Sequence, residues 1–154
     1  MNENSLPQIL ESPIFGLLTL SEVCVPGFHS FNYSAEWATD HHDLISVVFH
    51  PPSHDATSWT KDLRQAESRG QDIVASEQTI LSTGKKIFRR LFKHYQIAPA
   101  DIDKMFPFLK LSIIKLVSSG NDELVYEPCQ PFPSFNLTVL LDREFRVTEA
   151  SFGG

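Results

Sequence analysis

Four of the six histidines lie close together in the sequence and beside carboxylates, between residues 40 and 55. Imidazole and carboxylate groups bind metal ions and also act as general acids and bases. The strand predicted between the two groups of histidines would span about 23 Å, so one metal ion could not take ligands from both. A small metal-dependent or acid–base enzyme is therefore kept as an alternative hypothesis, with these candidate residues: Asp40, His41, His42, Asp43, His50, His54 and Asp55.

Glu77 is a second candidate, because it interrupts the apolar side of a predicted helix. A carboxylate among apolar side chains loses hydration, which raises its pKa toward that of a general acid or base. It also lies near the start of the helix, where the helix dipole stabilises a carboxylate at the rim of a core. The sequence contains no nucleophile elbow, metalloprotease motif, P-loop or dinucleotide-binding glycine motif. We therefore predict a non-catalytic protein that needs no metal and no cofactor.

The helix that would position Glu77 spans residues 72–96 and is the longest periodic stretch of the chain. At about 100° per residue its apolar side chains fall within an arc of roughly 140°, which predicts an amphipathic helix. Gly84 lies in the middle of this apolar side and would let another element approach closely. A short helix is predicted before it, ending at Gly70, with an apolar side formed by Trp59, Leu63 and Ala66.

The other segments predict strands, by alternation of apolar and polar residues or by β-branched composition. The first three predict an antiparallel meander, and the last two predict a hairpin through residues 142–144. The fold class predicted is α+β: an antiparallel sheet of about six to seven strands, with helix 72–96 packed on one face. The whole chain, 1–154, is predicted to be a single domain with residues 1–13 as a loose lead-in. The predicted strands are 14–20 (with a bulge at Gly16), 28–37, 44–50, 109–117, 123–129, 135–141 and 145–152.

The net charge of -6 argues against nucleic acid as the partner and favours a basic protein. Five basic residues follow each other along the predicted helix, but cations are favoured near a helix C-terminus and no exposed aromatic residues are interleaved with them. We interpret this run as a solvated face. It consists of Lys85, Lys86, Arg89, Arg90 and Lys93.

Composition also bears on the compartment. Hydrophobic residues make up 42% of the chain and charged residues 21%, which is typical of a globular protein. No apolar run approaches the ~20 residues that span a bilayer, and the first residues lack the basic start of a signal peptide. We expect a cytoplasmic protein with Cys24 and Cys129 as two buried free thiols.

Several segments resemble a group of small bacterial domains of unknown function, some of which act as immunity proteins of polymorphic toxin systems. The similar features are I-F-G-L-L-T-L at 14–20, an aromatic strand ending at Trp37, the strand 44–49, the helix ending K-H-Y, and the closing pair N-L-T-V-L-L-D-R-E-F-R-V-T-E-A-S-F-G at 136–153. The resemblance covers most of the chain from Ile14. It implies a protein partner and no catalytic residues. The proline-rich loop 127–135 departs from the short polar loop expected for this group.

These observations together predict a binding protein that neutralises a cognate toxin, as a monomer or a homodimer. Acidic residues in predicted turns and strand ends would attract a basic partner, and the stiff loop 127–135 would present an aromatic contact. A structural subunit of a larger assembly is a further alternative. The predicted contact residues are Asp40, Asp43, Asp55, Asp122, Glu123, Glu127 and Phe132.

Overall fold

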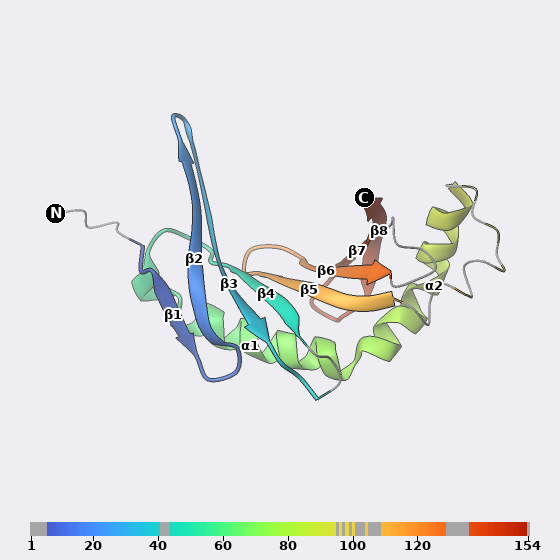
Figure 1. Ribbon diagram of the computed structural model, residues 1–154, viewed down its shortest axis with the longest axis horizontal. Coiled ribbons are helices and arrows are strands. Elements are labelled where there is room, and N and C mark those ends of the chain that lie inside the picture. The colour runs from blue at the N-terminus through green and yellow to red at the C-terminus, as the bar shows by residue number, and fades with distance from the viewer. Residues whose placement is uncertain are drawn as a thin grey trace.

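The computed structural model describes residues 6–40, 44–94, 96, 98, 100, 104, 109–128 and 136–153. These residues form an eight-stranded sheet with two α-helices along one side of it (Figure 1). The helices are α1 (Thr60–Ala75) and α2 (Glu77–His94), and a short 3-10 turn, η1 (Ala56–Ser58), precedes them. The strands are β1 (Ile9–Ser12), β2 (Gly16–Val25), β3 (Phe28–Trp37), β4 (Ile45–His50), β5 (Leu109–Val117), β6 (Asp122–Pro128), β7 (Asn136–Leu141) and β8 (Val147–Gly153).

The strands lie in the sheet in the same order as in the chain. Neighbouring strands are antiparallel, except that β4 and β5 are parallel and place Val47 beside Ile114. A parallel pair cannot be closed by a tight turn and needs a long crossover connection. The two helices lie in that connection, so both pack against the same face of the sheet.

The core lies between the helices and this covered face. In β4 and β7 every second residue is buried, as expected for strands with one covered side. α1 packs against β5, and α2 packs against β8. The strands contribute Ile45, Val47, Phe49, Leu137, Val139 and Leu141 to the core, and the helices contribute Leu63, Ala66, Ile73, Ile80 and Phe88.

The predicted α+β class is confirmed, but the sheet has eight strands rather than six to seven. The additional strand is β1, which lies within residues 1–13, the segment predicted to be a loose lead-in. Its four residues are too few to show an alternating pattern. Gly16 does not form a bulge, since it lies at the start of β2 next to the turn that follows β1. Its φ of +85° lies in the left-handed region that glycine adopts at least cost.

The predicted helix 72–96 is divided, and its first residues belong to α1. Ser76 leaves helical geometry, with φ -108° and ψ 10°, and its carbonyl accepts the first hydrogen bond of α2, from the Ile80 N–H at 2.9 Å. Ser76 thus separates the two helices and occupies the N-terminal cap position of the second. The periodicity did not reveal this break, because the buried side continues across it from Ile73 to Ile80.

Two glycines are buried inside helices because other side chains occupy the space of a Cβ atom. Gly70 was predicted to end a short helix, but it lies inside the 16-residue α1. A Cβ atom at Gly70 would come within 2.8 Å of the Phe15 ring. A Cβ atom at Gly84 would lie 2.9 Å from both the Phe88 ring and Val147 of β8. The close approach predicted at Gly84 is therefore confirmed, and the approaching element is β8.

Candidate binding surface

Among the described residues, α1 and α2 cover one side of the sheet and no helix covers the other, which we call the open face. It carries the outward residues of each strand, which the pairing places in register. One row of such side chains crosses the sheet from β2 to β8. This row consists of Thr19, Ser34, Val48, Lys115, Glu123, Leu140 and Glu149.

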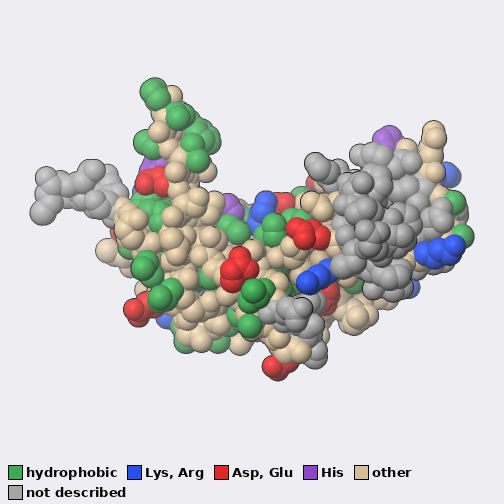
Figure 2. Space-filling model, in the orientation of Figure 1, with side chains coloured by type: hydrophobic (Ala, Val, Ile, Leu, Met, Phe, Trp, Pro, Cys, Tyr) green, Lys and Arg blue, Asp and Glu red, His purple; other side chains and the backbone are tan. Residues whose placement is uncertain are grey.

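The open face is hollowed and carries more acidic than basic side chains. Figure 2 shows the hollow beside the projecting β2–β3 hairpin, on the side away from the helices. The exposed side of α2 carries the opposite charge, since the five basic residues predicted to be solvated are all exposed. The charged residues that the register assigns to the open face are Glu11, Glu36, Glu123, Glu127 and Glu149, with Lys110 and Lys115.

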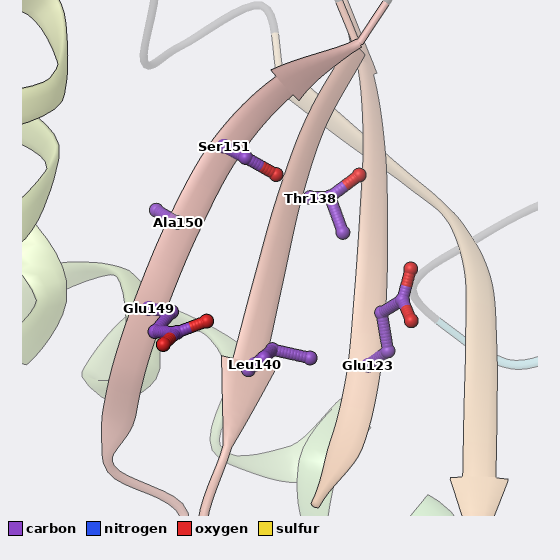
Figure 3. A pocket seen from close by; sticks show the side chains of 6 residues that line it. All are labelled: Glu123, Thr138, Leu140, Glu149, Ala150 and Ser151. Carbon is purple, nitrogen blue, oxygen red and sulfur yellow. The ribbon is translucent and has the colours of Figure 1, made fainter.

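A pocket of about 270 Å³ lies in this face over β6, β7 and β8. Figure 3 shows Glu123 and Glu149 on the two sides of Leu140, with the hydroxyl groups of Thr138 and Ser151 further along the same strands. Carboxylate and hydroxyl oxygens accept hydrogen bonds, and carboxylates attract cations. Glu123 already pairs with Lys115, at 3.5 Å, so a lysine or arginine side chain of a partner would meet Glu149 and compete with Lys115 for Glu123.

The β2–β3 hairpin projects from the sheet as a two-stranded arm (Figure 1). It closes at Pro26 and Gly27, whose residue types and the φ of +80° at Gly27 are those of a type II turn. Large apolar side chains near its tip are more than half exposed: Val23 54%, Val25 52% and Phe28 57%. The register places all three on the open-face side. Cys24, expected to be buried, is exposed on the opposite side of the arm.

The other side of the arm carries a polar and aromatic cluster. The His29 Nε2 and Glu22 Oε2 atoms are 2.6 Å apart, and His54 Nε2 lies 3.2 Å from His29 Nδ1. The Phe31 ring lies between His54, at 4.8 Å, and Trp59, at 5.8 Å, measured between ring centroids. These contacts fasten the base of the arm to the segment that follows β4.

The remaining histidine of that segment, His50, ends β4 and lies away from this cluster. Burial lowers the pKa of its imidazole, and the nearby charge of Lys115 lowers it further. Within the described ranges no three His, Cys, Asp or Glu side chains are grouped so that they could hold a metal ion. His41 and His42 lie outside the described residues.

Glu77 lies half-buried in the first turn of α2. Its charge acts on Tyr126: burial raises the pKa of that hydroxyl above its ordinary range, and Glu77 raises it further. The hydroxyl oxygen of Tyr126 is buried and has no hydrogen-bond partner among the described residues. The half-buried position of Glu77 is therefore that of a structural residue at the rim of the core.

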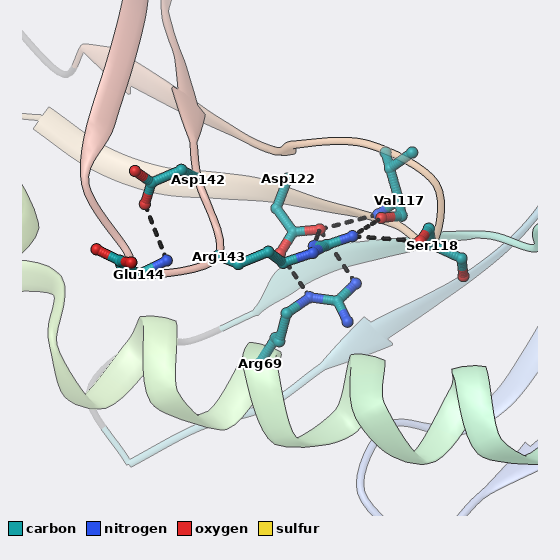
Figure 4. A network of polar contacts seen from close by, with 7 residues as sticks. All are labelled: Arg69, Val117, Ser118, Asp122, Asp142, Arg143 and Glu144. Atoms are coloured by element: carbon teal, nitrogen blue, oxygen red, sulfur yellow. Dashed lines mark hydrogen bonds and ion pairs between the residues drawn. The ribbon is translucent and has the colours of Figure 1, made fainter.

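Asp122, one of the predicted partner contacts, is buried on the covered face (Figure 4). Its carboxylate accepts two hydrogen bonds from Arg69, at 2.7 and 3.2 Å, and one from the Val117 N–H at 2.9 Å. Arg143 reaches the same carboxylate at 3.2 Å and also donates to the Val117 carbonyl at 2.6 Å. Asp122 therefore joins α1 to two turns of the sheet and is not available to a partner.

The other predicted contacts do not form one surface. Glu123 and Glu127 lie together on β6, on the open face. Asp40 precedes β4 and lines a second pocket with Trp37, whereas Asp55 follows β4 and caps η1 by accepting from the Thr57 N–H. Asp43 and Phe132 lie outside the described residues.

Sequence reasoning did not select Glu36, Glu149 or the arm residues. Glu36 and Glu149 belong to strands that the sequence predicted correctly, but their neighbours across the sheet depend on register. A signal for the arm was present, because Pro26-Gly27 lies between two apolar runs, a hairpin pattern. Residues 21–26, between the predicted strands 14–20 and 28–37, are expected from the sequence to turn or to extend the first strand, and in the structure they extend it to Val25.

In the part of the chain that the structure describes, no helix is both long enough and apolar enough to cross a membrane. Comparisons with family models, with curated proteins and with solved structures gave no match.

Proposed function

We propose that this protein is a non-catalytic binding domain that docks a basic protein partner on the open face of its sheet. The partner class that fits best is a toxin that this chain neutralises as an immunity protein, in the cytoplasm. The observation that carries the proposal is the open face itself, a hollowed sheet surface that the helices leave uncovered and that is rich in carboxylates.

Charge distribution supports a basic partner. α2 carries five basic residues and one acidic residue, so the rest of the chain has ten more acidic than basic residues. Acidic side chains on the open face would raise the association rate with a basic protein, and this effect weakens as salt increases. The pocket between Glu123 and Glu149 would receive a basic side chain at the centre of the contact.

The arm supports a protein partner rather than a small ligand. Exposed apolar side chains gathered on one surface often mark a protein contact, and Val23, Val25 and Phe28 lie on the open-face side of the arm. A partner seated in the hollow would meet carboxylates on its floor and apolar side chains on one wall.

The test uses a charge reversal on the open face and a matched reversal on the helical side. Glu149→Lys alters an exposed residue beside the pocket, and Asp72→Lys makes the same change at an exposed position of α1. The probe is the product of the neighbouring reading frame, purified and titrated by calorimetry. We expect Glu149→Lys to weaken binding at least about tenfold, roughly 1.4 kcal/mol, and Asp72→Lys to leave it unchanged. Equal affinity for the two variants, or no binding by the unaltered chain, would refute the proposal.

A further inference from the structure

Among the residues that the structure describes, no other strand covers the outer edge of β2 in the arm. β1 runs alongside β2 only as far as Thr19, and the last hydrogen bond between them is from the Leu20 N–H to the Gln8 carbonyl, at 3.0 Å. β2 nevertheless continues to Val25, which pairs with Phe28 of β3. Residues 21–25 are therefore paired on one side only, and all of them are exposed.

The direction of the backbone groups at this edge follows from the same hydrogen bond. Because the Leu20 N–H points toward β1 and successive residues alternate, Glu22 and Cys24 point their N–H and C=O groups out of the free edge. Val23 and Val25 instead bond to β3. Unpaired groups at a strand edge are a template for another strand. The other edge of the arm, in β3, also has no paired strand among the described residues over 28–32, and there the His54 side chain lies against His29, with His54 Nε2 3.2 Å from His29 Nδ1.

We propose that two copies of this chain pair through this edge, with β2 antiparallel to β2 of the second copy and a twofold axis at Val23. Glu22 then forms a hydrogen-bonded pair with Cys24 of the second copy, and Cys24 with its Glu22. Val23 faces Val23 of the second copy in a non-hydrogen-bonded pair, where side chains lie closer together. The contact is isologous, so it closes as a dimer.

Charge opposes a second copy less at this edge than elsewhere on the surface. The protein carries a net charge of -6, so most surfaces of two copies repel each other, yet Glu22 is the one charged Asp, Glu, Lys or Arg residue in the segment 21–30. The register places Glu22 opposite Cys24 and not opposite a second Glu22. It also brings the half-exposed Val23 side chains together and sets Val25 beside Ser21, which removes apolar surface from water. This contact takes up part of the Val23 and Val25 surface that the proposed partner would meet, whereas Glu123 and Glu149, over β6 and β8, stay free. Dimerisation is measured without a partner, so it does not depend on the proposed function.

The decisive variant is Cys24→Pro, compared with Cys24→Val. Proline removes an N–H that points out of the free edge and that the arm itself does not use, which is the position where an edge strand tolerates proline. Valine removes the thiol and keeps the N–H. Sedimentation velocity under reducing conditions should show a concentration-dependent dimer for the unaltered chain and for Cys24→Val. Cys24→Pro should raise the dimer dissociation constant roughly tenfold or more.

A measurement on the unaltered chain removes any dependence on how the proline variant folds. Amide hydrogen exchange at Glu22 and Cys24 should slow as protein concentration rises, whereas exchange at Val23 and Val25, which bond to β3, should not change. A chain that is monomeric at every concentration would overturn the proposal. So would a dimer that leaves exchange at Glu22 and Cys24 unaffected.

The register has its own test. With both native cysteines replaced by serine, Val23→Cys should give a disulfide-linked dimer on mild oxidation, because residue 23 faces its own symmetry mate. Val25→Cys should give much less, since that residue faces Ser21 of the second copy. Equal yields from the two variants would refute this register.

Discussion

Replacing Asp122 by alanine should destabilise the protein more than any change to an exposed ion pair. The Asp122 side chain is 2% exposed, and its main partner, Arg69, is 14% exposed. Together with Arg143 they connect α1 to the β5–β6 and β7–β8 turns. The alanine variant removes the carboxylate and leaves the Arg69 guanidinium buried without an opposite charge.

The expected loss follows from what is left unpaired. Removing one partner of a buried ion pair costs about 3–5 kcal/mol, because the remaining charge stays desolvated. The Val117 N–H also loses its acceptor, a loss of about 1–3 kcal/mol that overlaps with the first. Arg143 adds little, since its side chain is 43% exposed. We expect about 3–5 kcal/mol in total, a large part of the ~5–15 kcal/mol that holds a typical domain folded.

Urea unfolding followed by circular dichroism measures this loss. With a slope of about 2 kcal/mol per M, the midpoint of Asp122→Ala should fall by roughly 2 M. The matched control is Glu144→Ala, which removes a 2.6 Å ion pair with Arg146 that is mostly exposed and should cost less than about 1 kcal/mol. Changing Arg69 to Met and Asp122 to Leu together should recover part of the loss, because no buried charge remains. A cost for Asp122→Ala as small as that of the control would refute the reasoning.

Two further predictions concern packing and pH. Gly84→Ala should lower the free energy of unfolding by about 1 kcal/mol, because contact with Phe88 and Val147 at 2.9 Å outweighs the better helix propensity of alanine; a higher urea midpoint would contradict this. His50→Gln should reduce the dependence of stability on pH between about pH 7.5 and pH 5. Burial and the charge of Lys115 lower the His50 pKa in the folded state, so its contribution is present above the unfolded pKa of about 6.5 and is lost as pH falls below it. Urea midpoints at the two pH values measure the difference, and an unchanged pH dependence in the variant would contradict the assignment.

The sequence was sufficient where a local pattern carries the information. Apolar and β-branched composition in residues 44–50 and 135–141, and alternation in residues 109–117, predicted strands, and the structure has β4, β7 and β5 there. In β5 the alternation shifts at an irregularity between Leu111 and Ile113, so Ile114 and Leu116 are buried in place of Ile113. The apolar periodicity of residues 72–96 predicted a helix against the sheet, and the net charge was known from composition alone. β1 and the break at Ser76 were missed, because a four-residue strand and a single non-helical residue do not disturb such patterns.

Tertiary structure decided which acidic residues face solvent. Asp122 and Glu123 are adjacent in the chain, and the sequence predicted both as partner contacts. Because strand side chains alternate, Asp122 points to the covered face and meets Arg69, whereas Glu123 points to the open face. Strand register sets the face to which each residue points. The partner of Asp122 is Arg69, which lies 53 positions away in the sequence.

The arm also has features that the sequence determines and one that only the tertiary structure decides. The sequence contains its apolar residues and its Pro26-Gly27 turn, but whether a strand edge is covered depends on the length of its neighbour. β1 stops at Ser12 while β2 runs from Gly16 to Val25. This mismatch in length is a property of the assembled sheet, and it leaves residues 21–25 without a paired strand on one side among the described residues.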